Sequence, residues 1–206
     1  MTTSHLTTPP AVDLDRVRVH RMRDKASPAH LTLRDRLRAW WTLKVRHRNI
    51  RAGRDVVLKE RVEIAICDTG SLTIGDHAFF HARTWLLLTK PHPVVEIGQW
   101  VFVGRHTIIA AKNRITIGDY TIFAPRCYVI DHEHGFGAHD IIHNQQSRLD
   151  EVVIGRDCYF GTGAIVLGGV HIGDGAVIGA GSVVTKDIPA YQMWAGNPAR
   201  YIRDRT

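Results

Sequence analysis

Residues 170–184 read VHIGDGAVIGAGSVV, and the large aliphatic residues of this stretch recur at every sixth position. An amphipathic helix would space apolar residues by three and four, and a half-buried strand would alternate them. A glycine, Gly173 or Gly179, follows each of the two isoleucines. The period of six therefore predicts a chain that turns after every short strand. Followed backwards, the residues in this phase are Val184, Ile178, Ile172, Val166, Phe160 and Ile154.

The same period recurs in three earlier blocks. We expect a solenoid of flat, three-sided coils, with one aliphatic side chain of each hexad inside and stacked about 4.8 Å from its counterpart one coil away. Glycine tolerates the dihedral angles of the corner that follows. The fifth hexad position also points inward, so Cys127 and Cys158 should be buried packing residues and not nucleophiles. The earlier blocks are Ile74, Phe80, Leu86; Ile97, Val103, Ile109; and Ile117, Phe123, Val129.

Composition narrows the class of protein. A chain of 206 residues suits one domain with an appendage. No stretch approaches the roughly 18 apolar residues of a membrane span, and the first residues lack the apolar run of a signal peptide. The three cysteines are far apart and form no C-x-x-C pair, so the sequence indicates neither a disulfide framework nor a zinc knuckle. We expect a cytoplasmic protein.

The basic charge belongs to the N-terminal arm. Residues 1–54 hold 13 Lys and Arg against 4 Asp and Glu, whereas residues 55–206 hold 14 against 16. The main body therefore lacks the basic stripe of a nucleic-acid-binding domain. Within the arm, residues 31–50 predict one amphipathic helix that Gly53 would end. This helix either docks its Trp/Leu face on the main body or lies on an anionic membrane surface as a peripheral contact. Its apolar positions are Leu33, Leu37, Trp40, Trp41 and Val45.

Residues 178–202, IGAGSVVTKDIPAYQMWAGNPARYI, extend the pattern beyond the repeat itself. Together with the hexads they resemble the hexapeptide-repeat acyltransferases, most closely the galactoside, maltose and polysaccharide O-acetyltransferases. The resemblance implies a mainly β fold, a left-handed parallel β-helix, over residues 55–206. It also implies a tail at 189–206, an acyl-coenzyme A co-substrate without a required metal, and a saccharide or glycolipid acceptor. Carbohydrate modification by acetyl transfer is the expected reaction.

The period breaks between Val129 and Ile154, so residues 130–153 should leave the solenoid as a loop. Loops on rigid scaffolds concentrate catalytic groups, and a histidine base accelerates attack by a hydroxyl on a thioester about 10²–10⁴-fold. In the family this base follows a hexad like the one that begins Phe123-Ala-Pro. Counting from Pro125 without gaps places it at His134, with His132 as the alternative. Residues that could orient the imidazole are Asp131, Glu133 and Asp140.

The resemblance also implies the donor and acceptor contacts. Coenzyme A would lie in a groove between neighbouring subunits, its phosphates held by arginine forks. Trp194 would cover the adenine or pin the tail to the solenoid, and Tyr159 takes the place of an acceptor-side Trp. Implied contacts of the pantetheine arm are Thr162, Ala180, Thr185 and Lys186, and those of the phosphates are Arg200 and Arg203.

One departure concerns the acceptor site. Where relatives have an acceptor-binding Asn, this chain has Gly104, followed by Arg105 and His106. These two residues join Asp131 and Tyr159 as candidate substrate contacts. Because an acyl carboxylate needs a cationic partner, Arg105 and His106 leave succinyl-coenzyme A open beside acetyl-coenzyme A.

Two other functions fit the same solenoid. A zinc lyase similar to the γ-class carbonic anhydrases could use His132 and His134, with His77, His81 or His106 as third ligand. A non-catalytic trimeric scaffold would bind no acyl-coenzyme A. In every case we expect a homotrimer, because the extruded loop and the open groove of each chain need a neighbour to close a site.

Overall fold

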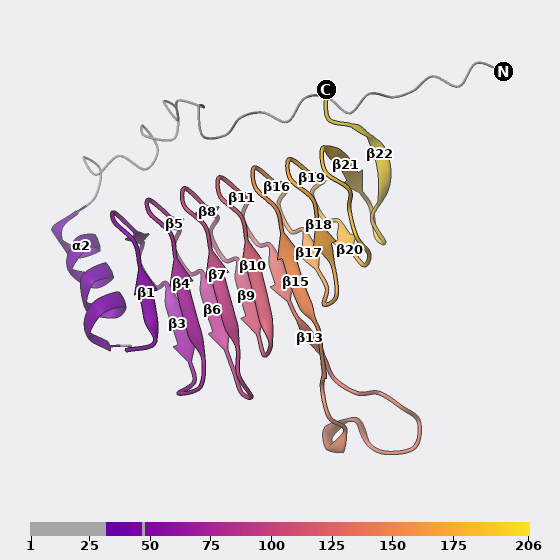
Figure 1. Cartoon of the computed structure of the whole chain (residues 1–206), viewed down its shortest axis with the longest axis horizontal. Helices are drawn as coiled ribbons and strands as arrows, with labels where there is room; N and C mark the ends of the chain where they lie inside the picture. Colours follow the sequence, from indigo (N-terminus) through magenta and orange to yellow (C-terminus); the bar gives the residue numbers. More distant parts are fainter. Residues whose placement is uncertain (1–31, 47) are drawn as a thin grey trace.

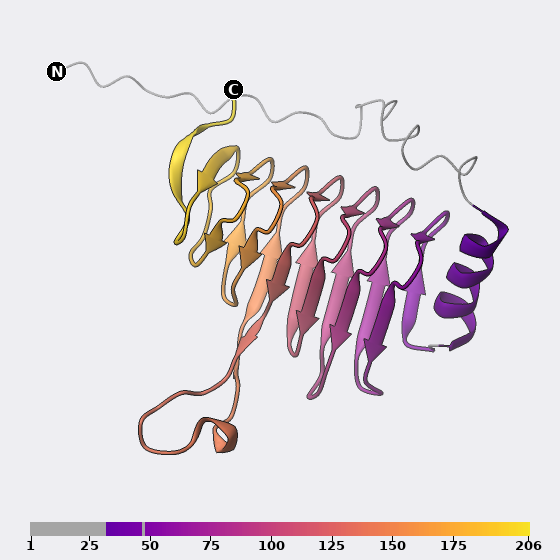
Figure 2. The ribbon, with the colours of Figure 1, turned by 180° about the vertical axis from the view of Figure 1, so that it is seen from behind.

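The computed structural model describes residues 32–46 and 48–206, which form a parallel β-solenoid with a short helix at one end (Figures 1 and 2). Three parallel sheets make its three sides. Sheet A contains β1 (Ile50–Ala52), β4 (Ser71–Ile74), β7 (Val94–Ile97), β10 (Arg114–Ile117), β15 (Glu151–Ile154) and β18 (His171–Ile172). Sheet B contains β2 (Val57–Leu58), β5 (Phe79–Phe80), β8 (Phe102–Val103), β11 (Ile122–Phe123), β16 (Tyr159–Phe160) and β19 (Val177–Ile178). Sheet C contains β3 (Glu63–Ile66), β6 (Trp85–Leu88), β9 (Ile108–Ala111), β12 (Tyr128–Ile130), β17 (Ile165–Val166) and β20 (Val183–Val184).

The predicted hexad residues form the core. Every aliphatic or phenylalanine position in the phase of six is at most 3% exposed. Partners stack in register along each sheet, as in the pair Phe123 and Phe160, whose ring centroids lie 4.5 Å apart. The solenoid predicted from the period is confirmed, and it begins at Ile50, five residues before the expected boundary at 55.

The chain passes from sheet A to B, from B to C, and from C to the next A, so the solenoid has an A–B, a B–C and a C–A corner. The glycines after the hexad isoleucines are required for a different reason than expected. Gly173 and Gly179 do not adopt a positive φ; a Cβ on Gly179 would lie 2.7 Å from the Cβ of Ala195 in the next turn of chain. The left-handed conformation falls two residues later, at Gly175 and Gly181, both with φ of 68°.

The cysteines at the fifth hexad position pack inside, as predicted. Cys127 and Cys158 are each 1% exposed. Burial raises the pKa of the Cys127 thiol to about 11 and that of Cys158 to about 12. Both therefore stay protonated near neutral pH and are poor nucleophiles.

The N-terminal helix is shorter than predicted and packs through another face. It comprises α2 (Leu33–Trp40) and the π-helical η2 (Trp41–Arg46), which together close the first coil through Ala39 and Leu43. Thr32 and Asp35 form a capping box, and the Asp35 carboxylate also forms an ion pair with Lys59 Nζ at 3.1 Å. The expected docking of the Trp/Leu face on the body is wrong, since the residues of that face are exposed: Leu33 72%, Leu37 55%, Trp40 58% and Trp41 56%. The side chain of Val45 and residues 1–31 lie outside what the structure describes.

The C-terminal tail returns over the last coil. Strand β21 (Gln192–Ala195) adds to sheet B beside β19, and β22 (Arg200–Asp204) pairs antiparallel with β21. Within residues 32–46 and 48–206, no helix has the length and apolar character needed to cross a bilayer.

Candidate functional site

Residues 131–150 leave the solenoid at the C–A corner, between β12 and β15, and project far beyond the sheets (Figure 1). At its root the segment forms a two-stranded antiparallel ribbon of β13 (His132–Glu133) and β14 (Arg148–Leu149). A single short helical turn, η3 (Ile142–Asn144), lies near its tip. The ribbon fixes the first residues of the segment against the solenoid.

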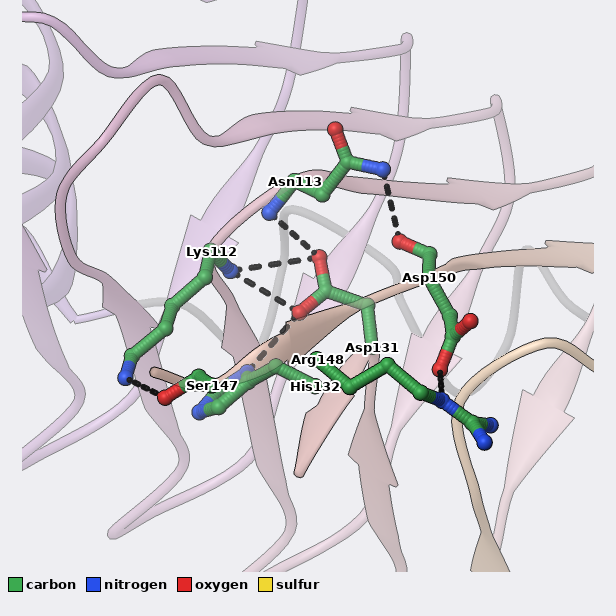
Figure 3. A network of polar contacts seen from close by, with 7 residues as sticks. All are labelled: Lys112, Asn113, Asp131, His132, Ser147, Arg148 and Asp150. Carbon is green, nitrogen blue, oxygen red and sulfur yellow. Dashed lines mark hydrogen bonds and ion pairs between the residues drawn. The ribbon is translucent and has the colours of Figure 1, made fainter. Parts of the chain in front are cut away.

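Asp131 sits at the root of this segment and is completely buried. Its carboxylate accepts the main-chain N–H of Lys112 at 2.9 Å and that of Asn113 at 2.8 Å, both from the preceding coil (Figure 3). The same carboxylate lies 2.8 Å from Nδ1 of His132. Since an ionised carboxylate can only accept, Nδ1 of His132 carries the proton that points at Asp131. In the neutral ring, Nε2 then holds a free lone pair and can take a proton.

A second layer of contacts fastens the ribbon to the coil. The Lys112 ammonium donates to Ser147 Oγ at 3.0 Å, and the Asn113 amide donates to the main-chain oxygen of Asp150 at 2.7 Å. Arg148 pairs with the Asp150 carboxylate at 2.7 Å. Figure 3 shows these residues surrounding Asp131 and His132. The His132 side chain is only 13% exposed, so its orientation is set by the fold.

The side chains of the other histidines of the segment are not held in one orientation by burial or by a carboxylate. His134, His139 and His143 are exposed, and none of the three accepts or donates a side-chain hydrogen bond among the described residues. Of the three carboxylates suggested as orienting groups, Asp131 contacts an imidazole, that of His132. Asp140 instead accepts the main-chain N–H of Ile141. The geometry therefore favours His132 over His134 as a proton acceptor.

The candidate donor contacts are divided between two corners of the chain. Thr162 and Ala180 lie exposed at the B–C corner, where the Gly181 N–H donates to the Thr162 oxygen at 2.9 Å. Thr185 and Lys186 lie exposed at the C–A corner, the corner of Asp131. Strand β20 (Val183–Val184) of sheet C lies between Ala180 and Thr185, so the two sets are at opposite ends of the strands of that sheet. One chain does not bring the two sets together.

The tail residues take different positions. Trp194 is 9% exposed and belongs to the core, with its indole N–H on the Gln192 side chain at 2.9 Å and Lys186 Nζ at 5.3 Å from the ring centroid. This position favours pinning of the tail over contact with an adenine. Arg200 and Arg203 are exposed on β22 and make no ion pair among the described residues.

The candidate acceptor contacts lie on sheet B and the B–C corner. Tyr159 is 44% exposed on the outer face of β16. Arg105 and His106 are exposed at the B–C corner and line a cavity of about 490 Å³. Neither residue contacts Asp131, which lies across sheet C at the next corner.

The outer face of sheet C is apolar, unlike that of sheet A. Its outward positions include Trp85 and Leu167, each 37% exposed, and half-buried Ile108, Tyr128 and Ile165. Sheet A instead presents an Arg114–Glu96 ion pair at 2.9 Å. An apolar face of this extent is typical of a protein–protein contact.

The histidines of the zinc hypothesis lie on three different corners. His132 is at the C–A corner, His81 and His106 are at the B–C corner, and His77 stacks on Trp100 at the A–B corner. Among the described residues of one chain, no three His, Cys, Asp or Glu side chains cluster as metal ligands. A zinc site built from the described residues would therefore need more than one chain.

The sequence and fold match known transferases. Residues 151–186 match the family described as bacterial transferase hexapeptide (six repeats). The putative lipopolysaccharide biosynthesis O-acetyl transferase WbbJ of Escherichia coli strain K12 is 32% identical over 172 residues, which cover 75% of this chain and 87% of that protein. The putative colanic acid biosynthesis acetyltransferase WcaF of the same strain is 34% identical over 109 residues, which cover 53% of this chain and only 58% of that protein.

Solved structures share the fold. The N-acyltransferase AntD of Bacillus cereus, in complex with dTDP and 3-hydroxybutyryl-coenzyme A, matches with a TM-score of 0.65. The match covers 77% of this chain and 85% of that chain, at 18% identity. At this identity the comparison establishes the solenoid architecture.

Proposed function

The chain belongs to the hexapeptide-repeat transferase family, and we propose that it is an acyl-coenzyme-A-dependent O-acyltransferase acting on a saccharide or glycolipid hydroxyl. Acetyl is the group named for the matched relatives, which supports acetyl-coenzyme A as donor. The observation that carries the proposal is the buried Asp131 carboxylate 2.8 Å from Nδ1 of His132. This pair provides the general base that O-acyl transfer needs.

In the proposed mechanism His132 acts as the base and Asp131 orients it. Nε2 takes the proton of the acceptor hydroxyl as its oxygen forms a bond to the thioester carbonyl. The imidazolium that results is stabilised by Asp131, whose remaining acceptor positions are already filled by the N–H groups of Lys112 and Asn113. The proton then passes to the departing thiolate, so the products are an ester and free coenzyme A.

We propose that this site is completed by a second copy in a homotrimer. The donor contacts Thr162 and Ala180 lie at the B–C corner, whereas His132, Thr185 and Lys186 lie at the C–A corner. A heterologous interface joins two different surfaces of identical chains, and three copies close it into a ring. Sheet C of each copy would face the threefold axis, which would cover the apolar side chains around Trp85 and Ile108.

The exposed face of α2 and the first residue of η2 support a peripheral membrane contact. Leu33, Leu37, Trp40 and Trp41 project outward beside Arg34, and residues 1–54 are strongly basic. Apolar insertion combined with attraction to anionic lipid binds such helices to bilayers. Co-sedimentation with vesicles containing phosphatidylglycerol, but not with pure phosphatidylcholine, is the expected result. Loss of this co-sedimentation in Trp40→Ser/Trp41→Ser would locate the contact at α2, and equal binding by that variant would contradict it.

The enzymatic proposal is tested by thiol release from acetyl-, succinyl- and longer acyl-coenzyme A with a panel of saccharides. We expect His132→Ala to lose at least about 10²-fold in kcat with an unchanged Tm, and His134→Ala to lose much less. A greater loss for His134→Ala would assign the base to the exposed histidine. Bound zinc without coenzyme A binding would favour the lyase. A Tm that no acyl-coenzyme A raises would favour the scaffold, because a ligand of the native state must raise it.

A further inference from the structure

The B–C corner carries arginines at one repeated turn position. Arg61, Arg83 and Arg126 adopt positive φ of 56°, 60° and 65°, and His106 takes this position in the coil between the last two, with φ of 60°. The N–H of Arg83 donates to the Glu60 oxygen at 3.2 Å, that of His106 to Ala82 at 3.2 Å, and that of Arg126 to Arg105 at 2.8 Å. Four successive coils are therefore in register here.

The guanidinium groups of this corner are unpaired. We call Arg61, Arg83, Arg105 and Arg126 the basic edge; all four are exposed, and none forms an ion pair with a carboxylate among the residues that the structure describes. Among the described residues that line the cavity at this corner, Glu60 provides the carboxylate. Neighbouring Lys59 is already paired with Asp35 at 3.1 Å. Unpaired positive charges on a rigid corner repel one another, and this repulsion does not stabilise the fold.

The first three arginines surround one hollow. The cavity of about 490 Å³ is lined by Glu60, Arg61, Ala82, Arg83, Arg105 and His106. Coils repeat about every 4.8 Å, so three guanidinium groups can converge on two adjacent phosphates. The field also acts on His81, which lies beside this corner: burial lowers the pKa of its imidazole, and the positive charge of Arg105 lowers it further.

The basic edge continues into the proposed donor contacts. In the next coil after Arg126 the same turn position is Gly163, whose N–H donates to the Pro125 oxygen at 3.0 Å, and the following one is Gly181. Thr162 and Ala180 precede these glycines. The reacting acyl group would therefore lie near Thr162. The basic edge would begin one coil away from that group, at Arg126, and would face the acceptor.

We propose that the basic edge binds the phosphates of a diphosphate-linked saccharide, which is the acceptor of the reaction proposed above. This inference rests on that proposed function and names its substrate class. A single acyl carboxylate, as in a succinyl donor, would need one cation, whereas this edge presents four in consecutive coils. The diphosphate can belong to a nucleotide-linked or a polyprenyl-linked sugar.

Binding is measured first, since it does not depend on turnover. Isothermal titration of the full-length protein with inorganic pyrophosphate should show saturable binding that weakens as NaCl rises. Arg83→Gln/Arg105→Gln should weaken it at least about 10-fold. The matched control is Arg54→Gln, an arginine of the A–B corner, which should leave binding unchanged. Equal binding by the double variant, or no binding by the wild type, would overturn the inference.

Acetyl transfer then distinguishes the acceptors. We expect kcat/KM at least about 10-fold higher for a diphosphate-linked sugar than for the same free sugar, and this preference should vanish in Arg83→Gln/Arg105→Gln. Comparison of a uridine-diphosphate-linked with a short polyprenyl-diphosphate-linked sugar identifies the source. If the variant slows only succinyl transfer, the edge serves the donor and the inference is wrong. If pyrophosphate binds at the edge but no acceptor is acetylated, the proposed function fails while the anion site stands.

Discussion

The A–B and B–C corners are built from the same coils, yet they treat charge in opposite ways. At the A–B corner, charged side chains pair between turns of chain: Arg54 with Asp76 at 2.7 Å, and Arg205 with Asp157 at 3.0 Å. Asp76 also accepts the main-chain N–H of Arg54 at 2.8 Å. At the B–C corner, the four arginines of the basic edge have no carboxylate partner among the described residues. The first corner uses its charges to hold coils together, and the second leaves them available to a ligand.

The corners also differ in the space they leave. At the A–B corner each hexad residue is followed by glycine, and a Cβ on Gly118 would lie 2.6 Å from the carbonyl carbon of Gly155. At the B–C corner the same position is Lys59, His81 or Ala124 in three coils and glycine in the other three, where the packing is equally close: a Cβ on Gly104 would lie 2.6 Å from the carbonyl carbon of Ala124. The A–B corner is therefore tight in every coil and pairs its charges, whereas the B–C corner accepts larger side chains in three of its coils.

The largest stability effect should follow from filling the tight corner. Gly118→Ala forces a methyl group into backbone atoms of the next coil, so we expect a loss of about 3 kcal/mol in the free energy of unfolding. Gly181→Ala at the B–C corner meets no atom within 4 Å and has only its φ of 68° to oppose it, which predicts a loss of about 1 kcal/mol. Urea unfolding of both variants tests the order, and a greater loss for Gly181→Ala would contradict the close packing at Gly118.

A pH-dependent effect should follow from the paired charges. The N–H of Arg54, and then its guanidinium, hold the pKa of Asp76 below its ordinary value. The stability that ionised Asp76 provides is therefore present above about pH 4 and is lost as the pH falls through the lowered value. We expect Asp76→Asn to lower Tm at pH 7, whereas at about pH 2 the Tm of the variant should differ little from that of the wild type. A constant difference in Tm over that range would exclude this linkage.

Removal of an unpaired charge should affect stability least. Arg83→Gln deletes a cation of the basic edge, so the free energy of unfolding should change by less than about 0.5 kcal/mol, or rise as repulsion is relieved. The measurement is the Tm of Arg83→Gln, Asp76→Asn and the wild type, all by thermal unfolding at pH 7. A loss of Tm as large as that of Asp76→Asn would show that Arg83 holds the coils together.

Thiol labelling checks that the interior is closed at both corners. Cys127 lies inside the B–C corner and Cys158 inside the A–B corner, with pKa values raised by burial to about 11 and about 12. At pH 8 we expect one equivalent of thiol reagent to react with the folded protein, at half-buried Cys67, and three after unfolding. Three fast equivalents in the folded state would contradict the packing.

Much of the fold was predictable because each short strand contributes one large side chain to a narrow interior, which makes the period strict. The N-terminal helix was less predictable, because its pattern contains two apolar faces. The first coil is closed by Ala39 and Leu43, while the larger residues Trp40 and Trp41 remain outside. The size of a side chain alone does not tell which face packs.

The segment that carries the candidate base was predictable from the sequence, but the contacts around it were not. The break in the period marked the segment that carries His132 and His134, and Asp131 was among the suggested orienting groups. Counting without gaps from Pro125 predicts His134, whereas the contact with Asp131 favours His132, so the assignment of the base stays a prediction. The partners that fix Asp131 are main-chain groups of Lys112 and Asn113 in the preceding coil, which no local motif indicates.

The proposal that two copies share each site can be tested directly by mixed trimers. His132→Ala disables the C–A corner, and Thr162→Trp obstructs the B–C corner. Each homotrimer should be inactive, whereas co-expressed chains should recover about a quarter of wild-type activity, since one in four neighbouring pairs then presents two intact corners. Mixed trimers that form, by light scattering and differential tags, yet show no recovered acetyl transfer would contradict a shared site.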